Sequence, residues 1–289
     1  MKQDKLVHIA CNLCGADDTA PWAVRNGMSV IKCRQCGLIY VNPRVDDPNP
    51  DNIYDTSYFD YYKLTEWANG KTFIRRVKLL EKYSPGKGRI LDVGCAIGDF
   101  MQVAKSRGWD PHGVDITADS IDEIRRRTGV EIKVGDFATV PYDENYFDVV
   151  NLGDSIEHMM DPHDALRKVH HILKPGGIGY LRTPDALHLM PLLFRQSWIQ
   201  IKPKEHLFYF TRKTMRRMLE QSGLEILKVS SSGTYCTVDI LLNRITHYFT
   251  RQRVIPATLR FMANSLRLGR IRFPLDTLEE MEVIFRKPS

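Results

Sequence analysis

The sequence predicts an α/β protein built on a doubly wound parallel sheet, with a small cysteine-rich module in front of it. Three observations carry this prediction. From residue 89 onward, short apolar runs alternate with segments of helical periodicity, which is the pattern of a parallel sheet covered by helices. A glycine-containing loop follows the first apolar run. Four cysteines form two Cys-x-x-Cys pairs near the amino terminus.

The composition of the 289-residue chain is that of a globular protein, with 43% hydrophobic and 26% charged residues. This length fits one domain with elaborations, or one domain plus a small module. The sequence contains no apolar run of about 18 residues, which a membrane-spanning helix requires. The first residues also lack the apolar core of a signal peptide, so we expect a cytoplasmic protein.

Residues 1–43 are predicted to form a zinc ribbon. Cys11 and Cys14 form the first pair, Cys33 and Cys36 form the second, and eighteen residues separate the pairs. In a reducing compartment this spacing favours zinc over disulfides, because four thiolates complete a closed tetrahedral site. The alternative is two unrelated cysteine pairs. Short strands are expected around the second pair, in "SVIKC" and "GLIYVNP".

Residues 44–84 are predicted to form a linker followed by a helical segment. The linker is rich in proline and aspartate ("NPRVDDPNPD"), which excludes a core element. Further on, Phe73, Val77 and Leu80 lie on one face of an expected helix that ends at "SPGKG". The aromatic-rich stretch before this helix is too apolar for a free linker, so we expect it to pack against the protein.

Residues 85–289 are predicted to form the main domain. One of its helices is well marked, because Asp161 can cap it and Pro162 suits its first turn. Two segments interrupt the alternating pattern as insertions, at 184–210 and 234–279. Strands are expected at 89–93, 111–116, 130–135, 147–152, 177–183, 224–233 and 280–288, and helices at 98–107, 117–128, 162–173 and 211–223.

The loop in "RILDVGCAIGDF" (89–100) can be tested against nucleotide-binding patterns. A dinucleotide loop starting at Gly94 would need glycines where this chain has Ala96 and Asp99. A phosphate-binding P-loop would need Gly-Lys followed by serine or threonine, which this segment also lacks. What remains is Asp-x-Gly-x-x-x-Gly between a strand and a helix. This pattern suits a cofactor without phosphates that carries a positive amino group.

The segment "LDVGCAIGDF" resembles the first motif of class I S-adenosylmethionine (SAM)-dependent methyltransferases. The segments "GVDI", "VGDF", "FDVVNLGDSIEHMMDP", "ILKPGGIGYLRTPD" and "VIFRKP" resemble the later motifs and follow in the same order. The resemblance implies SAM as the cofactor and a Rossmann-like sheet of seven strands with an antiparallel last strand. It also implies these cofactor-binding residues: Asp92, Gly94, Cys95, Ala96, Gly98, Asp115, Ile116, Asp136, Phe137 and Leu152.

In this family the acid at the position of Asp115 holds both ribose hydroxyls, and the acid at the position of Asp136 faces the adenine amino group. By the same resemblance, Phe137 or Ile116 would cover the adenine ring. Ala96 departs mildly from the family pattern. We expect it at a negative φ, where a methyl group is tolerated in the loop.

The four-cysteine ribbon ahead of this core, together with "EHLFYFT" after the fifth strand, resembles bacterial zinc-ribbon methyltransferases related to the ubiquinone-biosynthesis O-methyltransferases. The likeness implies a small-molecule, sugar, glycan or quinone-like acceptor that is methylated at oxygen. Methylation at nitrogen or carbon of a sugar or polyketide-like acceptor stays open. So does a different class of function, a non-catalytic SAM-fold protein that serves as a binding subunit.

A hydroxyl acceptor must lose its proton near the moment of attack, which requires a base or a metal. Asp154, Glu157 and His158 stand just beyond the fourth strand, at the ligand-binding edge of such a sheet. In the quinone O-methyltransferases that this chain resembles, an acid-x-x-Glu-His arrangement here is associated with a divalent metal. His206 and Tyr209 are further catalytic candidates. The alternative for these residues is a structural role, with hydrogen bonds that only stabilise the fold.

A four-thiolate site leaves zinc no open position, so we expect the ribbon to be structural or substrate-shaping. The stretch between its cysteine pairs is not basic, which argues against nucleic acid as a partner. Residues 240–275 contain seven arginines and no acidic side chain, and the formal net charge of the whole chain is +6. Three interpretations stay open for them: an amphipathic element on an anionic membrane, a lid or dimer face that binds an anionic substrate, or a solvated helical cap.

Overall fold

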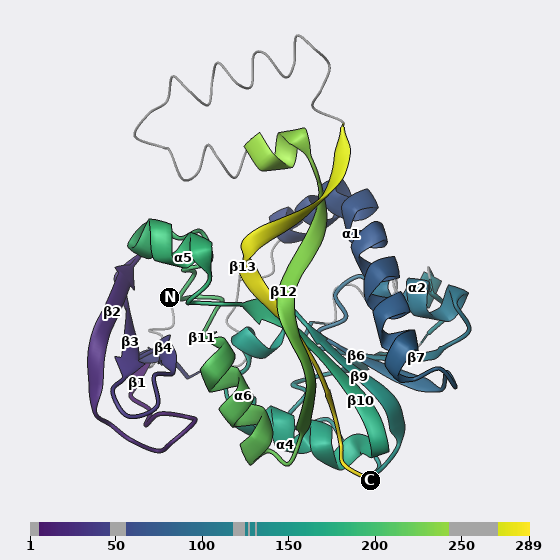
Figure 1. The fold of residues 1–289 in the computed structure, drawn as a ribbon, viewed down its shortest axis with the longest axis horizontal. Helices are drawn as coiled ribbons and strands as arrows, with labels where there is room; N and C mark the ends of the chain where they lie inside the picture. Colours follow the sequence, from purple (N-terminus) through teal and green to yellow (C-terminus); the bar gives the residue numbers. More distant parts are fainter. Residues whose placement is uncertain (1–5, 47–55, 118–124, 127, 131, 243–270) are drawn as a thin grey trace.

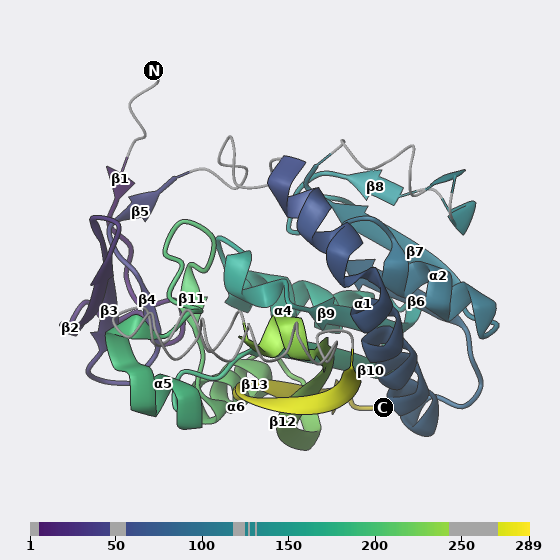
Figure 2. The same cartoon turned by 90° about the horizontal axis from the view of Figure 1, so that it is seen from above.

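The computed structural model describes residues 6–46, 56–117, 125–126, 128–130, 132–242 and 271–289. Seven strands form one sheet in the order β12-β13-β10-β9-β6-β7-β8 (Figure 1; β8 is labelled in Figure 2). The neighbours among β8, β7, β6, β9 and β10 are parallel, while β13 is antiparallel to both β10 and β12. This confirms the predicted sheet with its antiparallel last strand. The strands span Arg89–Val93 (β6), Asp110–Asp115 (β7), Ile132–Val134 (β8), Phe147–Gly153 (β9), Leu173–Pro184 (β10), Glu225–Thr237 (β12) and Arg272–Arg286 (β13).

Helices cover both faces of the sheet (Figure 2). α1 contacts α2, and α4 contacts α6. Two predicted caps are confirmed: Asp161 accepts a hydrogen bond from the amide of Asp164, and Thr211 accepts one from the amide of Thr214. These side chains satisfy amides at the helix starts that have no partner within the helix. The helices span Thr56–Tyr83 (α1), Asp99–Ser106 (α2), Pro162–Ile172 (α4), Leu189–Phe194 (α5) and Arg212–Gln221 (α6).

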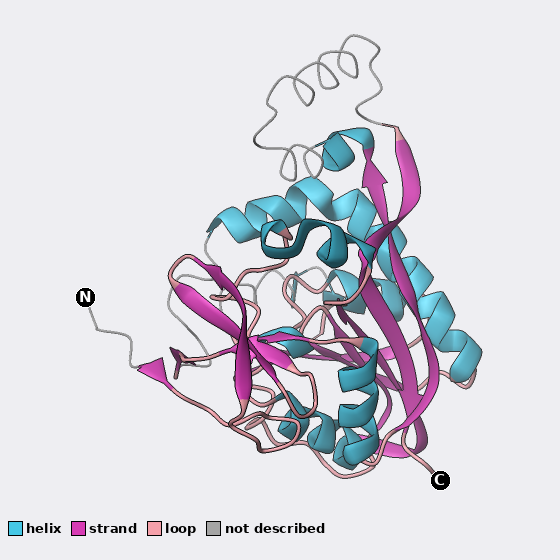
Figure 3. Ribbon diagram, turned by 60° about the vertical axis from the view of Figure 1, so that its left-hand side comes forward, coloured by secondary structure: helices cyan, strands magenta, loops and turns pink. Residues whose placement is uncertain are grey.

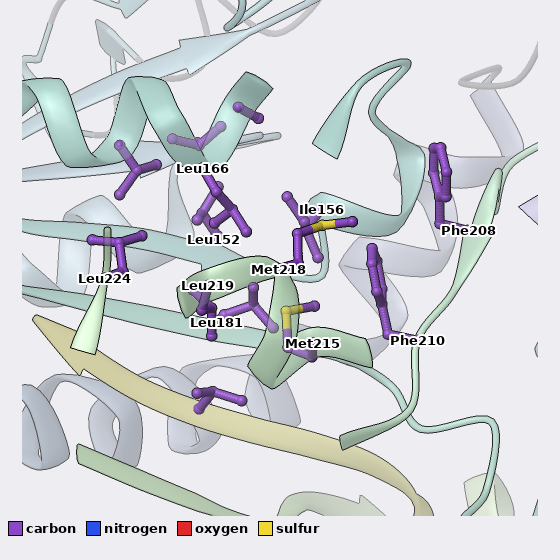
Figure 4. Close-up of a cluster of buried hydrophobic side chains, with 14 of the residues drawn as sticks. Leu152, Ile156, Leu166, Leu181, Phe208, Phe210, Met215, Met218, Leu219 and Leu224 are labelled. Atoms are coloured by element: carbon purple, nitrogen blue, oxygen red, sulfur yellow. The ribbon is translucent and has the colours of Figure 1, made fainter. Parts of the chain in front are cut away.

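The central strands are buried on both faces because helices cover both sides of the sheet. Neighbouring side chains along a strand point to opposite sides, so they enter two separate cores. On one face, Ile90 and Val149 pack with Val77 and Leu80 of α1, as the helical periodicity predicts. On the other face the adjoining residues of the same strands form a second core with α4 and α6. Figure 4 shows part of it, with Leu152, Ile156, Leu166, Leu181, Met215, Met218 and Leu219.

The strands of the four-cysteine module lie in a second sheet, in the order β11-β4-β3-β2 (Figure 3). Three strands come from the amino-terminal region: β2 (Thr19–Arg25), β3 (Met28–Cys33) and β4 (Ile39–Val41). The fourth, β11 (Phe208–Tyr209), comes from the segment expected only as an irregular insertion, and it pairs with β4. The module and the main domain therefore share one sheet. Two short strands, β1 (Leu6–Val7) and β5 (Arg44–Val45), pair beside it.

The carboxyl-terminal insertion is shorter than predicted. β12 continues to Thr237 and β13 begins at Arg272, and the two pair from Gly233↔Asp276 to Thr237↔Arg272. Both ends of the expected insertion at 234–279 therefore belong to a β-hairpin arm formed by β12 and β13. Aromatic and β-branched residues in "TYCT" and "RFPL" favour this extended structure.

Two further differences concern local signals. The strand β2 was not predicted, because Pro21 within it weakens the strand pattern; the structure accommodates it with a register shift between Pro21 and Ala23. Most of the helix expected at 117–128 and most of the arginine-rich stretch at 240–275 lie outside the described residues. Within the described part of the chain, no helix combines the length and the apolar character needed to cross a membrane.

Candidate functional site

The glycine loop joins the end of β6 to α2. Gly94 (φ 74°) and Gly98 (φ 80°) both have left-handed conformations, which glycine adopts without steric cost. Ala96 also has a positive φ, 46°, so the prediction of a negative φ at this residue is wrong. The left-handed region costs a residue with a side chain about 1–2 kcal/mol. The backbone amide of Ala96 offsets this cost by donating a hydrogen bond to Oδ2 of Asp115, at 2.8 Å.

Asp115 ends β7 beside this loop. Its Oδ1 accepts hydrogen bonds from the amide and the hydroxyl of Thr117, both at 3.0 Å. Burial raises the pKa of Asp115, although the amides of Thr117 and Ala96 oppose the shift. The carboxylate is therefore fixed by the loop on one side and by its own turn on the other, at the carboxyl end of the sheet where this fold binds ligands.

Asp92 lies on β6, one residue before the strand ends. Its Oδ1 accepts a hydrogen bond from Nδ2 of Asn151 at 2.6 Å. Burial raises the pKa of Asp92 to about 7, while Asn151 and the nearby Arg76 lower it. A buried carboxyl group that is half protonated near neutral pH is suited to meet a cationic group, because a positive charge would favour its ionised form.

The remaining predicted cofactor residues differ in how much they are buried. Asp136 follows β8, and its Oδ1 accepts a hydrogen bond from the amide of Ala138 at 2.9 Å. Phe137 is buried in the core, whereas Ile116 stays half-exposed. Cys95 and Leu152 are buried as well. Of the two residues predicted to cover an adenine ring, Ile116 is the one with accessible surface.

Beyond β9, a short 3₁₀ turn (Ile156–His158) brings three polar side chains together. We call Glu157, His158 and His206 the Glu-His-His cluster. One ligand atom of each lies within 4.8 Å of the others. The two imidazole rings have centroids 4.9 Å apart and planes at 87° to each other. In the described part of the chain, Nδ1 of both histidines and Oε2 of Glu157 are buried without a hydrogen-bond partner.

Burial dominates the electrostatics of the Glu-His-His cluster. It raises the pKa of Glu157 to about 8, with a further contribution from the charge of Asp154. It lowers the pKa of His158 and lowers that of His206 well below the usual value of 6.5. All three side chains therefore favour their neutral forms at pH 7. Ionisation of Glu157 in this buried position would therefore need a compensating positive charge, such as a bound cation.

The structure does not place Asp154 in this cluster, although the sequence grouped it with Glu157 and His158. Asp154 has a positive φ of 64° and its Oδ2 forms ion pairs with Arg182 at 2.9 Å and with Arg76 at 3.3 Å. The left-handed turn directs the carboxylate toward these two guanidinium groups. His206 takes the place predicted for Asp154, because β11 and the turn before it carry His206 to the end of β9.

Tyr209 is fully buried, and its hydroxyl group is already paired outside the cluster. Its hydroxyl oxygen accepts a hydrogen bond from the amide of Lys202 at 3.2 Å, and its ring centroid lies 6.3 Å from that of His206. Burial raises the pKa of Tyr209 above its usual range. These contacts fit the structural alternative for Tyr209 better than a role in proton transfer.

The four cysteines of the amino-terminal module converge. The Sγ atoms of Cys11 and Cys36 are 3.4 Å apart, and those of Cys14 and Cys33 are 3.5 Å apart. Burial opposes ionisation of Cys33, but hydrogen bonds from the amides of Cys36 and Gln35 outweigh it and lower its pKa to about 7. Four converging thiols, one of them acidic, fit a tetrahedral zinc ion, for which thiolates are the preferred ligands.

Sequence reasoning missed Arg76 and Arg182, which hold Asp154 at the edge of the site. Arg76 is buried, and its guanidinium also lies 4.7 Å from the centroid of the Tyr180 ring. The sequence does contain a signal that Arg76 is buried, because it shares the apolar face of the predicted helix with Phe73, Val77 and Leu80. Arg182 lies within the fifth strand and carries no comparable local signal.

The family comparison agrees with this geometry. The methyltransferase-domain family matches residues 64–229, more than half of the chain. Phosphoethanolamine N-methyltransferase 1 of Arabidopsis thaliana is 35% identical over 129 residues, which cover 40% of this chain and 25% of that protein. Ubiquinone biosynthesis O-methyltransferase of Aeromonas salmonicida is 27% identical over 155 residues, which cover 49% of this chain and 65% of that protein. The chain thus spans less than two thirds of the length of these relatives.

Solved structures share the fold. Phosphoethanolamine N-methyltransferase 2 of Haemonchus contortus, in complex with phosphomonomethylethanolamine and S-adenosylhomocysteine, superposes with a TM-score of 0.57 at 18% identity, covering 87% of this chain and 62% of that one. A SAM-dependent methyltransferase of Archaeoglobus fulgidus gives a TM-score of 0.53 at 20% identity, covering 78% and 99%. With the glycine loop, the strand order and the family match in agreement, the chain belongs to the methyltransferase-domain family, and its main domain has the fold of the SAM-dependent methyltransferases to which it is structurally similar.

Proposed function

We propose that this methyltransferase transfers the methyl group of SAM to an oxygen of a small-molecule, sugar, glycan or quinone-like acceptor, and that the Glu-His-His cluster provides the acceptor side of the reaction. The observation that carries the proposal is the convergence of three buried ligand atoms within 4.8 Å at the end of β9. This is the edge of the sheet where ligands bind in this fold.

The chemistry divides between cofactor and protein. The methyl group of SAM is bound to a sulfonium and is already electrophilic, so the protein needs only to align a nucleophile and exclude water. A hydroxyl nucleophile must also lose its proton. The unpartnered Nδ1 atoms of His158 and His206 are suited to accept it, because each ring also contacts a backbone carbonyl, of Glu205 and Gln200 respectively, that can hold the other nitrogen.

The same atoms suit a divalent cation. Glu157, His158 and His206 offer one carboxylate oxygen and two imidazole nitrogens, a donor set that first-row metals accept. A metal held there would lower the pKa of the acceptor hydroxyl. The sequence-based proposal of a metal at Asp154, Glu157 and His158 is thus revised, with His206 in place of Asp154.

The relatives support the transfer chemistry without naming the acceptor. The similar proteins are named for methylation of ubiquinone precursors, of phosphoethanolamine and of malonyl-[acyl-carrier protein]. Oxygen is favoured here because the Glu-His-His cluster offers proton acceptors, which a hydroxyl requires and an amine in its free-base form does not. Methylation at nitrogen or carbon and a SAM-binding subunit without turnover are the alternatives that the experiment separates.

The experiment measures transfer of tritium from methyl-labelled SAM to a panel of catechols, nucleotide-linked sugars and phosphoethanolamine. We expect transfer to a hydroxyl compound, reduced about 100-fold or more by His158→Gln and by His206→Gln. His171→Gln, an exposed histidine of α4, is the matched control and should keep the wild-type rate. Full activity of His158→Gln would overturn the role of the cluster. Transfer to none of the compounds despite SAM binding would favour the binding-subunit alternative.

Dialysis against EDTA separates the two roles of the cluster. If it acts as a base, transfer continues after dialysis. If it holds a divalent cation, transfer is lost and returns when Mg²⁺ or Mn²⁺ is added. The structural zinc site serves as an internal control, because zinc content measured on the same sample shows whether the chelator also stripped the cysteines.

A further inference from the structure

A hydrogen-bonded backbone path leads from the four-cysteine module to the Glu-His-His cluster. The amide of Val41, on β4 of the module, donates to the carbonyl oxygen of Leu207 at 2.9 Å. The amide of Leu207 donates in turn to the carbonyl oxygen of Glu157 at 2.8 Å. Leu207 directly follows His206. One residue therefore fixes His206 and Glu157 relative to each other and anchors both to the module.

Arg44 forms a second connection at the end of the module. Its Nη2 donates to the carbonyl oxygen of Met160 at 2.7 Å, two residues after His158. The guanidinium also lies 5.5 Å from the ring centroid of Phe208, two residues after His206. Arg44 is buried, and burial lowers its pKa. The charges of Asp161 and Asp46 oppose this shift. Because Arg44 contacts both segments that carry the histidines, we assign it a positioning role.

The cores of the two parts are also continuous. Leu13, Leu38 and Tyr40 of the module belong to the same buried cluster as Leu152 and Phe208 of the main domain. Leu13 stands between Cys11 and Cys14, and the Leu38 amide donates to Sγ of Cys36. Residues that would surround a bound zinc ion are therefore the same residues that pack beneath the end of β9.

The cofactor loop is held by different elements. The amides of Gly94 and Cys95 donate to the carbonyl oxygen of Val114 on β7, at 2.9 and 3.2 Å. The amide of Ala96 donates to Asp115, also on β7. The cofactor half of the sheet edge is thus organised by β6 and β7, whereas the acceptor half is organised by β9 and the module.

We infer that metal occupancy of the four cysteines positions the Glu-His-His cluster, through the path from β4 to Leu207 and through Arg44, and leaves the SAM half of the site unchanged. Zinc would fix the turns that carry Cys33 and Cys36, and those turns lead directly into β4. The module then acts as a positioning element of the acceptor site. This inference uses the proposed role of the cluster, but its test measures structure and does not depend on methyl transfer.

The first test compares hydrogen–deuterium exchange of single amides in zinc-loaded protein and in protein stripped with a thiol-reactive reagent and chelator, then re-reduced. We expect the Leu207 and Val41 amides to exchange at least tenfold faster without zinc. The Gly94 amide should change less than twofold, with the Kd for S-adenosylhomocysteine within twofold. Equal exchange at Leu207 in both samples would overturn the inference. So would equal acceleration at Gly94, which would show general destabilisation.

The second test keeps the metal in place and removes one contact. Arg44→Met eliminates the hydrogen bond to Met160 at similar side-chain volume, and Arg34→Met, an exposed arginine of the same module, is the matched control. We expect Arg44→Met to shift the imidazole NMR signals of His158 and His206, and Arg34→Met to leave them in place. Arg44→Lys retains a hydrogen-bond donor, so it should shift these imidazole signals less than Arg44→Met does. It replaces Arg44→Met in the test if that variant does not fold. Wild-type imidazole signals in the folded Arg44 variants would refute the positioning role.

Discussion

Asn151 of β9 donates a hydrogen bond to Asp92 of β6, from Nδ2 to Oδ1 at 2.6 Å, inside the central sheet. The bond joins the strand that leads to the cofactor loop with the strand that leads to the Glu-His-His cluster. Among the described residues, the hydrogen-bond partner of the Asp92 carboxyl is this uncharged amide. Burial accordingly raises the pKa of Asp92 to about 7.

We expect SAM to bind more tightly as the pH rises from about 5.5 to 7. In the free protein, Asp92 is mostly protonated below pH 7, and the ammonium group of SAM favours its ionised form. Binding below pH 7 must therefore release a proton, and the affinity increases with pH until the carboxyl is ionised without the cofactor. Calorimetry in two buffers of different ionisation enthalpy measures this proton release.

Asp92→Asn is the control for the pH dependence. It should weaken SAM binding and abolish the proton release, since asparagine does not titrate. A release of the same size in Asp92→Asn would assign the titration to another group.

Gly153→Ala should destabilise the protein strongly. A Cβ at Gly153 would overlap Nη1 of Arg76, which is buried and forms an ion pair with Asp154. Displacing Arg76 amounts to overpacking, and we expect a loss of about 1–3 kcal/mol in the free energy of unfolding. Urea denaturation measures it. Gly86→Ala, where a Cβ meets nothing within 4 Å, is the control and should change little; a similar loss in both variants would contradict the buried position of Arg76.

Ala96→Gly should be tolerated or stabilising, in contrast to most changes of alanine to glycine. The positive φ of 46° at Ala96 is strained for alanine and free for glycine. We expect the free energy of unfolding to stay the same or to rise by up to about 1 kcal/mol. Ala104→Gly, in α2, should instead lower it by about 1 kcal/mol or more. The two variants are compared by urea denaturation, and an equal loss in both would show that Ala96 is not strained.

One of the three interpretations of the arginine-rich stretch at 240–275, binding to an anionic membrane, can be tested by vesicle flotation. A larger fraction of the protein should float with vesicles of phosphatidylcholine and phosphatidylglycerol than with vesicles of phosphatidylcholine alone. The difference should disappear at high salt. Replacing residues 243–270 by a glycine-serine linker is the matched variant. Flotation that is equal with and without this stretch would exclude the membrane interpretation and leave the substrate lid or the solvated cap.

Much of the main domain could be predicted because its signals are local. The strand–helix alternation, the cap at Asp161 and the motifs that contain Gly94 and Asp115 are each contained in short stretches of sequence. The pairing of β11 with β4 could not be predicted in this way. It joins residues far apart in the chain, Phe208 to Tyr40, and neither strand is long enough to carry a clear alternating pattern.

The same reason explains the revised acceptor site. Asp154, Glu157 and His158 are neighbours in sequence, so they were grouped together. A left-handed turn at Asp154 sends its carboxylate to Arg76 and Arg182 instead. Sequence proximity could not show this turn, because a positive φ at an aspartate depends on the partners that hold the side chain. His206 was identified as a candidate, but its place beside Glu157 depends on the long-range pairing of β11.

We propose that the cofactor and the acceptor bind at separate halves of one sheet edge. Calorimetric titration of S-adenosylhomocysteine into wild type, Asp115→Ala and His158→Gln tests it most directly, with circular dichroism to confirm folding. We predict one binding site per chain in the wild type, at least tenfold weaker binding in Asp115→Ala, and a Kd within twofold of wild type in His158→Gln. No binding by the wild type, or an equal loss in both variants, would contradict the claim.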